Sequence, residues 1–213
     1  IMTKMIGKSV KRVEDKRFIT GKGQYTDDII LPNMVYAHFV RSPYAHAKIL
    51  SVDTAEALAH PGVIAVYTGA DVAEVNGVPC GWQVNFKNGE TMKEPKHPLL
   101  VADKARHAGD AVAVVIAESK EAARDAVDLV EVDYEELDAV VDPKKAAEDG
   151  APLVHEDAPN NICFDWELGN PKEEVDAAIA GSTHVTTLEF ANQRVIPNAI
   201  EPRSYIGDYD VAH

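Results

Sequence analysis

A short, almost wholly apolar run at residues 111–117, Ala-Val-Ala-Val-Val-Ile-Ala, constrains the fold of this chain more than any other feature. The run has the length of a strand, and its lack of polar positions is typical of a strand covered on both faces. It is the longest apolar run, and it is far shorter than the roughly 18 residues that a membrane-spanning helix requires. The sequence therefore predicts a soluble protein without a membrane span, built around this strand.

A helix and a second strand are expected directly after this run. Ser119 or Glu118 is placed to cap a helix whose small residues repeat at helical spacing from Ala122 to Val130, with charged residues on the other side. Residues 130–134 then alternate strictly between apolar and acidic, which is typical of a strand with one face in water. Strand, helix and strand at this spacing predict a right-handed crossover.

Shorter elements are expected on either side of this module. Before it, a helix over 54–60 with Asp53 as its cap is predicted among three strands, at residues 35–40, 48–52 and 63–67. After it, the pattern predicts a short acidic helix from Asp142-Pro143 to Gly150, a helix with Asn170 as N-cap, Pro171 at N1, Glu173 at N3 and its end at Gly181, and strands at residues 183–190 and 203–209.

Two irregular segments suggest how the chain is organised. Residues 75–98 are rich in glycine, proline and asparagine and are interpreted as a long surface loop. Such loops are functional, covered by a partner or disordered, and the sequence leaves these alternatives open. A Pro- and Asn-rich connector at residues 151–161 marks a domain edge. The length of 213 residues fits one large domain, or one domain and a piece of another.

The charge balance excludes some partners. Lys and Arg number 21 against 35 Asp and Glu, which gives a net charge of −14. Nucleic-acid affinity depends on clustered Lys and Arg that neutralise phosphates, so nucleic acid and anionic membranes are poor partners for this chain. No apolar segment follows Lys4, so no secretory signal is visible, and a cytoplasmic location is expected.

The residues that bind metals are scattered. Cys80 and Cys163 lie far apart without a neighbouring Cys or His at ligand spacing, which argues against a zinc site or a redox CxxC motif, and both are interpreted as buried small hydrophobes. The histidines have no HxH or HExxH spacing, so surface or packing roles are favoured over a metal site: His38, His46, His60, His97, His107, His155, His184 and His213.

Motifs for catalysis are equally sparse. The sequence has no dinucleotide fingerprint, P-loop or nucleophile elbow. The carboxylates in and directly after the predicted strand at residues 130–134 are interpreted as solvated: Glu131, Asp133, Glu135 and Glu136. A polar cluster at residues 189–203 contains Glu201 and Arg203, which can pair across a turn fixed by Pro202. An ion-paired corner between strands is favoured there over a substrate contact.

Several ordered motifs resemble the opening of the large subunit of molybdenum hydroxylases, the xanthine dehydrogenase and aldehyde oxidase family. The first segment, residues 6–28, which we call the lead-in, is most similar to the carbon monoxide dehydrogenase large-subunit branch. The resemblance extends from about Ile6 to Tyr209 and is specific to the family but not to a substrate. The motifs that carry it are residues 6–18, 21–28, 39–49, 109–117, 130–134 and 192–203.

The resemblance implies an α+β fold. It implies a lead-in and α/β hammerhead domain over residues 1–142, a connector over 143–170, and a truncated start of a molybdopterin-binding domain over 171–213. Glu201-Pro202-Arg203 resembles a family motif in this last part.

The resemblance also implies the chemistry of the complete enzyme. There, molybdenum is held by a pterin dithiolene, a metal-bound oxygen attacks an electrophilic carbon, hydride passes to a sulfido group, and a glutamate acts as base. Electrons leave through iron–sulfur and flavin subunits or domains. The residues that hold the cofactor and perform this chemistry lie further along the chain in that family. No catalytic, cofactor-binding or metal-binding residue is therefore assigned here, and neither cysteine is given such a role.

The leading hypothesis is that the chain is the N-terminal part of such a large subunit, inactive by itself and without a bound cofactor. Its partners would be the remainder of the large subunit and the iron–sulfur and flavin subunits. An isoleucine at position 1 and a chain end directly after a predicted strand, at His213, suggest a truncated sequence. The alternative is a split subunit or non-catalytic interaction module in which the 75–98 loop and the last strand bind a partner protein. A small acidic hydrolase ranks third.

Overall fold

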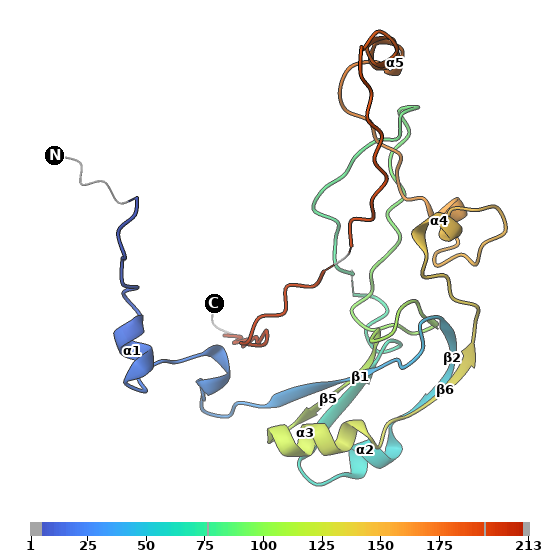
Figure 1. Ribbon diagram of the computed structural model, residues 1–213. Helices are drawn as coiled ribbons and strands as arrows, with labels where there is room; N and C mark the ends of the chain where they lie inside the picture. Colours follow the sequence, from blue (N-terminus) through green and yellow to red (C-terminus); the bar gives the residue numbers. More distant parts are fainter. Residues whose placement is uncertain (1–5, 76, 194, 211–213) are drawn as a thin grey trace. The chain divides into compact units, whose positions relative to one another are not determined.

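The computed structural model describes residues 6–75, 77–193 and 195–210 (Figure 1). Ile1, His213 and two residues of the predicted segments, Asn76 and Arg194, lie outside this described part. The chain divides into two compact units. One comprises Val35–Val185, and the other joins residues up to Met34 with those from Thr186 onward.

The larger unit contains two three-stranded antiparallel sheets. In the first, β5 (Ala111–Ala117) lies between β1 (Tyr36–Arg41) and β3 (Val63–Thr68). In the second, β2 (Ala47–Asp53) lies between β4 (Lys104–Ala105) and β6 (Glu131–Glu136). The predicted strands over these regions are confirmed to within two residues at each end.

The apolar run of β5 is a central strand, as its composition predicts. Val112, Ala113, Val115 and Ala117 are fully buried, and both edges of the strand are paired. Two helices pack against this sheet side by side, α2 (Ala55–Ala59) and α3 (Lys120–Val127) (Figure 1). The buried core that they form consists of small side chains from α2, α3, the edge strand β1, the central strand β5 and the residue before β6: Val40, Ala57, Ala113, Val115, Ala126 and Val130.

The caps of the two helices follow the sequence in part. The Ser119 hydroxyl accepts a hydrogen bond of 3.1 Å from the backbone N–H of Ala122, so Ser119 rather than Glu118 caps α3. The predicted cap of α2 is wrong by one residue: Thr54 and not Asp53 holds the N-cap position, although Asp53 Oδ1 accepts a hydrogen bond of 2.9 Å from the N–H of Ala55.

The predicted crossover is wrong. β5 and β6, which α3 connects, belong to different sheets, and β6 pairs antiparallel with β2. The crossover rule applies to parallel strands of one sheet. Both edges of β5 are already occupied by β1 and β3, so β6 has no place beside it and completes the second sheet instead.

The connecting segments are mostly irregular. In the described part of the predicted loop, residues 75 and 77–98, the backbone forms isolated bridges and no strand or helix, in agreement with the prediction. Beyond β6, the helices are α4 (Pro143–Ala146), the 3₁₀ turn η2 (Pro159–Asn161) and α5 (Lys172–Ala180). The predicted helix after Asp142 is shorter than expected: Asp142 caps it, but it ends well before Gly150.

The start of α5 also differs from the prediction. Pro171 rather than Asn170 precedes its first turn, and the Asn170 side chain instead donates a hydrogen bond of 3.4 Å to Glu174. Because the Asn170 amide is directed at this carboxylate, it does not cap the backbone. The helix ends at Gly181 as predicted.

The smaller unit contains α1 (Asp15–Ile19) and the 3₁₀ turn η1 (Thr26–Asp28). The strands expected at residues 183–190 and 203–209 are not formed: neither segment pairs with another in the described chain. A strand requires a neighbour to satisfy its backbone groups. Large apolar side chains of these segments remain in solvent, with exposed fractions of 77% for Leu188, 76% for Phe190 and 85% for Tyr205.

Candidate interaction surface

The 75–98 loop folds back on itself at its centre. The N–H of Met92 donates to the carbonyl of Val84 at 3.1 Å, and the N–H of Phe86 donates to that of Glu90 at 2.7 Å. Asn88 and Gly89 stand at the turn, where Gly89 adopts a φ of 86° that a glycine tolerates without strain. These contacts form a short hairpin of residues 84–92.

A second segment, residues 163–167, lies along this hairpin. The N–H of Lys93 donates to the carbonyl of Cys163 at 2.7 Å, and the N–H of Lys87 donates to that of Asp165 at 3.0 Å. Two segments that are far apart in the sequence therefore share backbone hydrogen bonds. The loop is held by the connector, without a regular sheet.

Aromatic rings join the same two segments. Trp82 packs edge-on against Phe164 and against Trp166, with centroid separations of 6.1 Å in both pairs and interplanar angles of 90° and 80°. Edge-to-face packing is a favourable geometry for aromatic pairs. We call these three residues the aromatic cluster. Their exposed fractions are 58%, 41% and 48%, so about half of each residue faces water.

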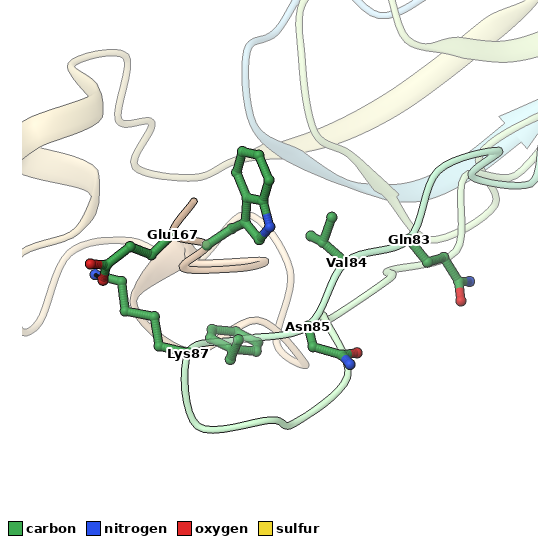
Figure 2. Close-up of a pocket in the computed structure, with 7 residues that line it drawn as sticks. Gln83, Val84, Asn85, Lys87 and Glu167 are labelled. Atoms are coloured by element: carbon green, nitrogen blue, oxygen red, sulfur yellow. Dashed lines mark ion pairs between the residues drawn. The ribbon is translucent and has the colours of Figure 1, made fainter. Parts of the chain in front are cut away.

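An ion-paired lysine borders the cluster. Lys87 Nζ lies 3.2 Å from Asp165 Oδ1 and 3.4 Å from Glu167 Oε2, and Figure 2 shows Lys87 and Glu167 pointing toward each other. Hydrogen bonds to Asp165 and then to Glu167 raise the pKa of Lys87. An open hollow of about 600 Å³ lies beside this pair, lined by Gln83, Val84, Asn85, Phe86, Lys87, Trp166 and Glu167.

The hollow does not fit the molybdenum cofactor that the family resemblance implies. A pterin phosphate requires free cationic or N–H donors, and the charge of Lys87 is already neutralised by two carboxylates. No three His, Cys, Asp or Glu side chains in the described part of the chain gather closely enough to hold a metal ion. This surface therefore supports no catalytic step through that cofactor.

The predicted burial of the cysteines is wrong. Cys80 is exposed and Cys163 is partly exposed. Cys80 Sγ lies 2.9 Å from the carbonyl of Trp82, and its N–H donates to Glu94 at 2.9 Å. Both residues belong to the loop and connector segments, which pack outside the main core, so their apolar character does not bury them.

The seven histidines that the structure describes do not converge on one site. His46 is buried, and its Nδ1 lies 2.8 Å from the carbonyl of Asp138, so this nitrogen carries a proton. His155 is partly buried, and burial together with the charge of Arg106 lowers its pKa. His38, His107 and His184 are exposed. These positions agree with the surface and packing roles expected from the sequence.

The carboxylates of β6 and the polar cluster near the end of the chain behave differently. The four carboxylates, Glu131, Asp133, Glu135 and Glu136, are exposed as expected. The pairing expected between Glu201 and Arg203 is wrong: within the described residues no ion pair joins them, and both side chains are exposed. Because neither flanking segment forms a strand, no corner holds the two charges together, and an exposed pair gains little by itself.

Sequence reasoning missed the aromatic cluster. Both tryptophans of the chain occur in segments without helical or strand periodicity. Large aromatic residues in such segments, away from a core, are the signal that could have indicated a contact surface.

Among the described residues, no helix is both long and apolar enough to cross a bilayer.

Comparison with known proteins places these features in a family. Residues 20–138, more than half of the chain, match the aldehyde oxidase and xanthine dehydrogenase a/b hammerhead domain. The chain is 40% identical over 212 residues to the carbon monoxide dehydrogenase large chain of Afipia carboxidovorans, covering 94% of this chain and 25% of that protein. It is 36% identical over 211 residues to the nicotine 6-hydroxylase large subunit of Paenarthrobacter nicotinovorans, covering 99% and 25%.

Comparison with solved structures indicates the same family. A solved structure of reconstituted CO dehydrogenase from Oligotropha carboxidovorans superimposes with a TM-score of 0.67 at 40% identity, over 84% of this chain and 22% of the other. The α+β hammerhead fold expected from the sequence is confirmed. The chain spans about a quarter of the length of these relatives.

Proposed function

Because the chain belongs to the aldehyde oxidase and xanthine dehydrogenase family through its a/b hammerhead domain, we propose that it serves as the hammerhead-bearing, N-terminal part of a molybdenum hydroxylase large subunit. In this role it contributes structure and subunit contacts, and the active centre lies elsewhere. The observation that carries the proposal is the match of residues 20–138 to the hammerhead domain. The 40% identity to a carbon monoxide dehydrogenase large chain, over 94% of this chain, supports it.

The proposal assigns a role to each part of the chain. Residues 1–142 are the lead-in and hammerhead domain, 143–170 the connector, and 171–213 the first part of the molybdopterin-binding domain. The apolar side chains at 183–190 and 203–209 support the last assignment. Exposed strand-forming segments of this kind are suited to pair with a sheet that another part of the enzyme supplies.

In the complete enzyme, a molybdenum–molybdopterin cofactor would supply the hydroxylation of carbon monoxide, an aldehyde or an N-heterocycle, with water as the oxygen source. Lys87, the lysine that lines the hollow, is paired with Asp165 and Glu167, and no group of three metal-binding side chains forms within the described chain. We propose that the chain's own contribution is to position other parts of the enzyme. Iron–sulfur and flavin subunits are the proposed partners, and the cytoplasm is the proposed location.

The direct test is to express the 213-residue chain and to measure its molybdenum content and its dye-linked oxidation of carbon monoxide, aldehydes and purines. We expect neither metal nor turnover. A complete carbon monoxide dehydrogenase expressed and assayed in the same way provides the positive control. Stoichiometric molybdenum, or turnover with any of these substrates, would overturn the assignment of the active centre to the rest of the enzyme.

A second candidate function is a non-catalytic interaction module or split subunit, which the exposed aromatic cluster favours. The genomic sequence that follows the codon of His213 distinguishes the two. A reading frame that continues into a molybdopterin-binding domain supports the large subunit. A stop codon at that point supports the module.

A further inference from the structure

The aromatic cluster has the composition of a contact surface. Trp82, Phe164 and Trp166 remain about half exposed although they pack against one another. Tryptophan is enriched among the residues that dominate binding energy at protein interfaces. Backbone hydrogen bonds from Lys93 to Cys163 and from Lys87 to Asp165 already hold the two segments in place. The rings therefore lose little conformational entropy when a partner binds.

The small area of the cluster indicates what kind of occupant it takes. Three half-exposed aromatic side chains offer roughly 300 Å² of surface. A separate protein usually needs about 800 Å² on each side for a stable interface. A segment of the same polypeptide needs much less, because its effective concentration is already in the millimolar range.

The charge beside the cluster adds a second requirement. Asp165 and Glu167 together carry two negative charges against the single positive charge of Lys87. All three side chains are about half exposed, so a docking segment that brings an additional Lys or Arg meets an acidic edge. The preferred occupant therefore combines an apolar side chain with a basic one.

We propose that the aromatic cluster is the docking site for a segment of the remaining three quarters of the large-subunit chain, one that places an apolar residue on Trp82 and Trp166 and a basic residue at Glu167. The proposal rests on the proposed function and on the length of the relatives, of which this chain spans about a quarter. Trp82 lies inside the hammerhead match, and Phe164 and Trp166 lie beyond its end at residue 138. Docking there would fix the connector against the hammerhead.

The test uses a hybrid large subunit in which this chain replaces the matching quarter of the Afipia carboxidovorans carbon monoxide dehydrogenase large chain. Hydroxyl-radical footprinting with mass spectrometry compares the oxidation of Trp82 and Trp166 in the isolated chain and in the hybrid. We expect loss of most of this oxidation in the hybrid large subunit alone, before other subunits are added. Molybdenum content and carbon monoxide oxidation of the assembled hybrid enzyme report separately on the proposed function.

Three outcomes would overturn the proposal. Undiminished oxidation of both tryptophans in the hybrid would leave the surface without an occupant. Protection that begins only when iron–sulfur or flavin subunits are added would assign the surface to another subunit. Protection that grows with the concentration of the isolated chain would assign it to a second copy. An active, molybdenum-loaded hybrid with unprotected tryptophans would reject the docking site and leave the proposed function standing.

A charge-reversal variant gives an independent readout that requires no change in the rings. Glu167→Lys places a positive charge where the occupant's basic residue is expected, so it should lower the melting temperature of the hybrid by about 4 °C more than that of the isolated chain. Asp125→Lys, on the exposed side of α3, is the matched control and should affect both proteins equally. Equal effects of Glu167→Lys on both proteins would contradict the docking model.

Discussion

The side-chain oxygen of Asn161 accepts a hydrogen bond of 2.8 Å from the backbone N–H of Val154. The amide nitrogen of the same side chain donates to the carbonyl of Ala146 at 2.8 Å and to that of Pro152 at 3.0 Å. One side chain thus binds the end of α4, the following turn and the connector. Asn161 has a φ of 56°, a left-handed conformation that asparagine tolerates better than most residues.

Asn161→Ala should lower the free energy of unfolding by about 2 kcal/mol, because it removes three backbone contacts at once. Asn161→Gly removes the same contacts but accepts the left-handed backbone, so it should cost less than alanine. Chemical denaturation of the three proteins measures both differences. Unfolding curves that coincide with that of the unsubstituted chain would mean that Asn161 does not hold the connector.

Ser119→Ala should destabilise the larger unit by about 1 kcal/mol, because the N-terminus of α3 loses its only side-chain cap seen among the described residues. The alternative variant Ser119→Asp should keep most of the stability of the unsubstituted chain, since a carboxylate accepts the same hydrogen bond and interacts favourably with the helix dipole. Thermal unfolding followed by circular dichroism compares the variants. Ser51→Ala, at an exposed position of β2, serves as the control.

The core of the fold was predictable because its signals are local. The apolar run of β5, the small-residue face of α3 and the cap at Ser119 each depend on a few neighbouring residues. The crossover and the strands at 183–190 and 203–209 were not predictable in the same way. Pairing depends on which edges are free, and β5 has none left for β6, while the two later segments find no partner in the described chain.

The sequence predicted the loop that carries the candidate surface but not the contacts that organise it. The composition of residues 75–98 correctly indicated a long loop. What organises the loop is the contact of Trp82 with Phe164 and Trp166, residues far along the chain that no periodicity connects. The exposure of Cys80 follows from the same cause, because residue type alone does not reveal that a segment packs outside the core.

Gly77→Ala should disrupt the base of the 75–98 loop. An added Cβ at Gly77 would collide with the carbonyl oxygen of His97, and the adjacent Val78 forms a bridge with His97 that fixes the backbone there. Gly81→Ala in the same loop is the matched control, because its Cβ would meet nothing within 4 Å. Hydrogen exchange of residues 78–97 should accelerate in the first variant and not in the second; equal exchange would contradict the close approach.

Acidification should destabilise the packing of the connector through His155. Burial, and then the positive charge of Arg106, lower its pKa below the ordinary value of 6.5, outweighing Asp157 and Glu156. The folded protein therefore binds this proton less readily than the unfolded chain does. The free energy of unfolding should fall as the pH drops below about 6.5, until the lowered pKa is passed.

His155→Gln should flatten this part of the pH dependence, because glutamine does not titrate in the range. The exposed His184→Gln serves as the control and should retain the slope of the unsubstituted chain. Denaturant unfolding at several pH values between 7 and 5 measures the three slopes. A His155→Gln slope as steep as that of the control would assign the acid sensitivity to other groups.

Trp82→Ala should loosen the contact between the loop and residues 163–167 much more than Lys87→Ala does. Trp82 makes two edge-on ring contacts, each worth about 0.5–1.5 kcal/mol beyond the buried area. The Lys87 side chain is about half exposed, so its ion pairs with Asp165 and Glu167 are screened by water and salt. Amide exchange at residues 163–167 should therefore accelerate strongly in Trp82→Ala and slightly in Lys87→Ala. The reverse order, together with a strong dependence on salt, would mean that charge and not aromatic packing holds the two segments together.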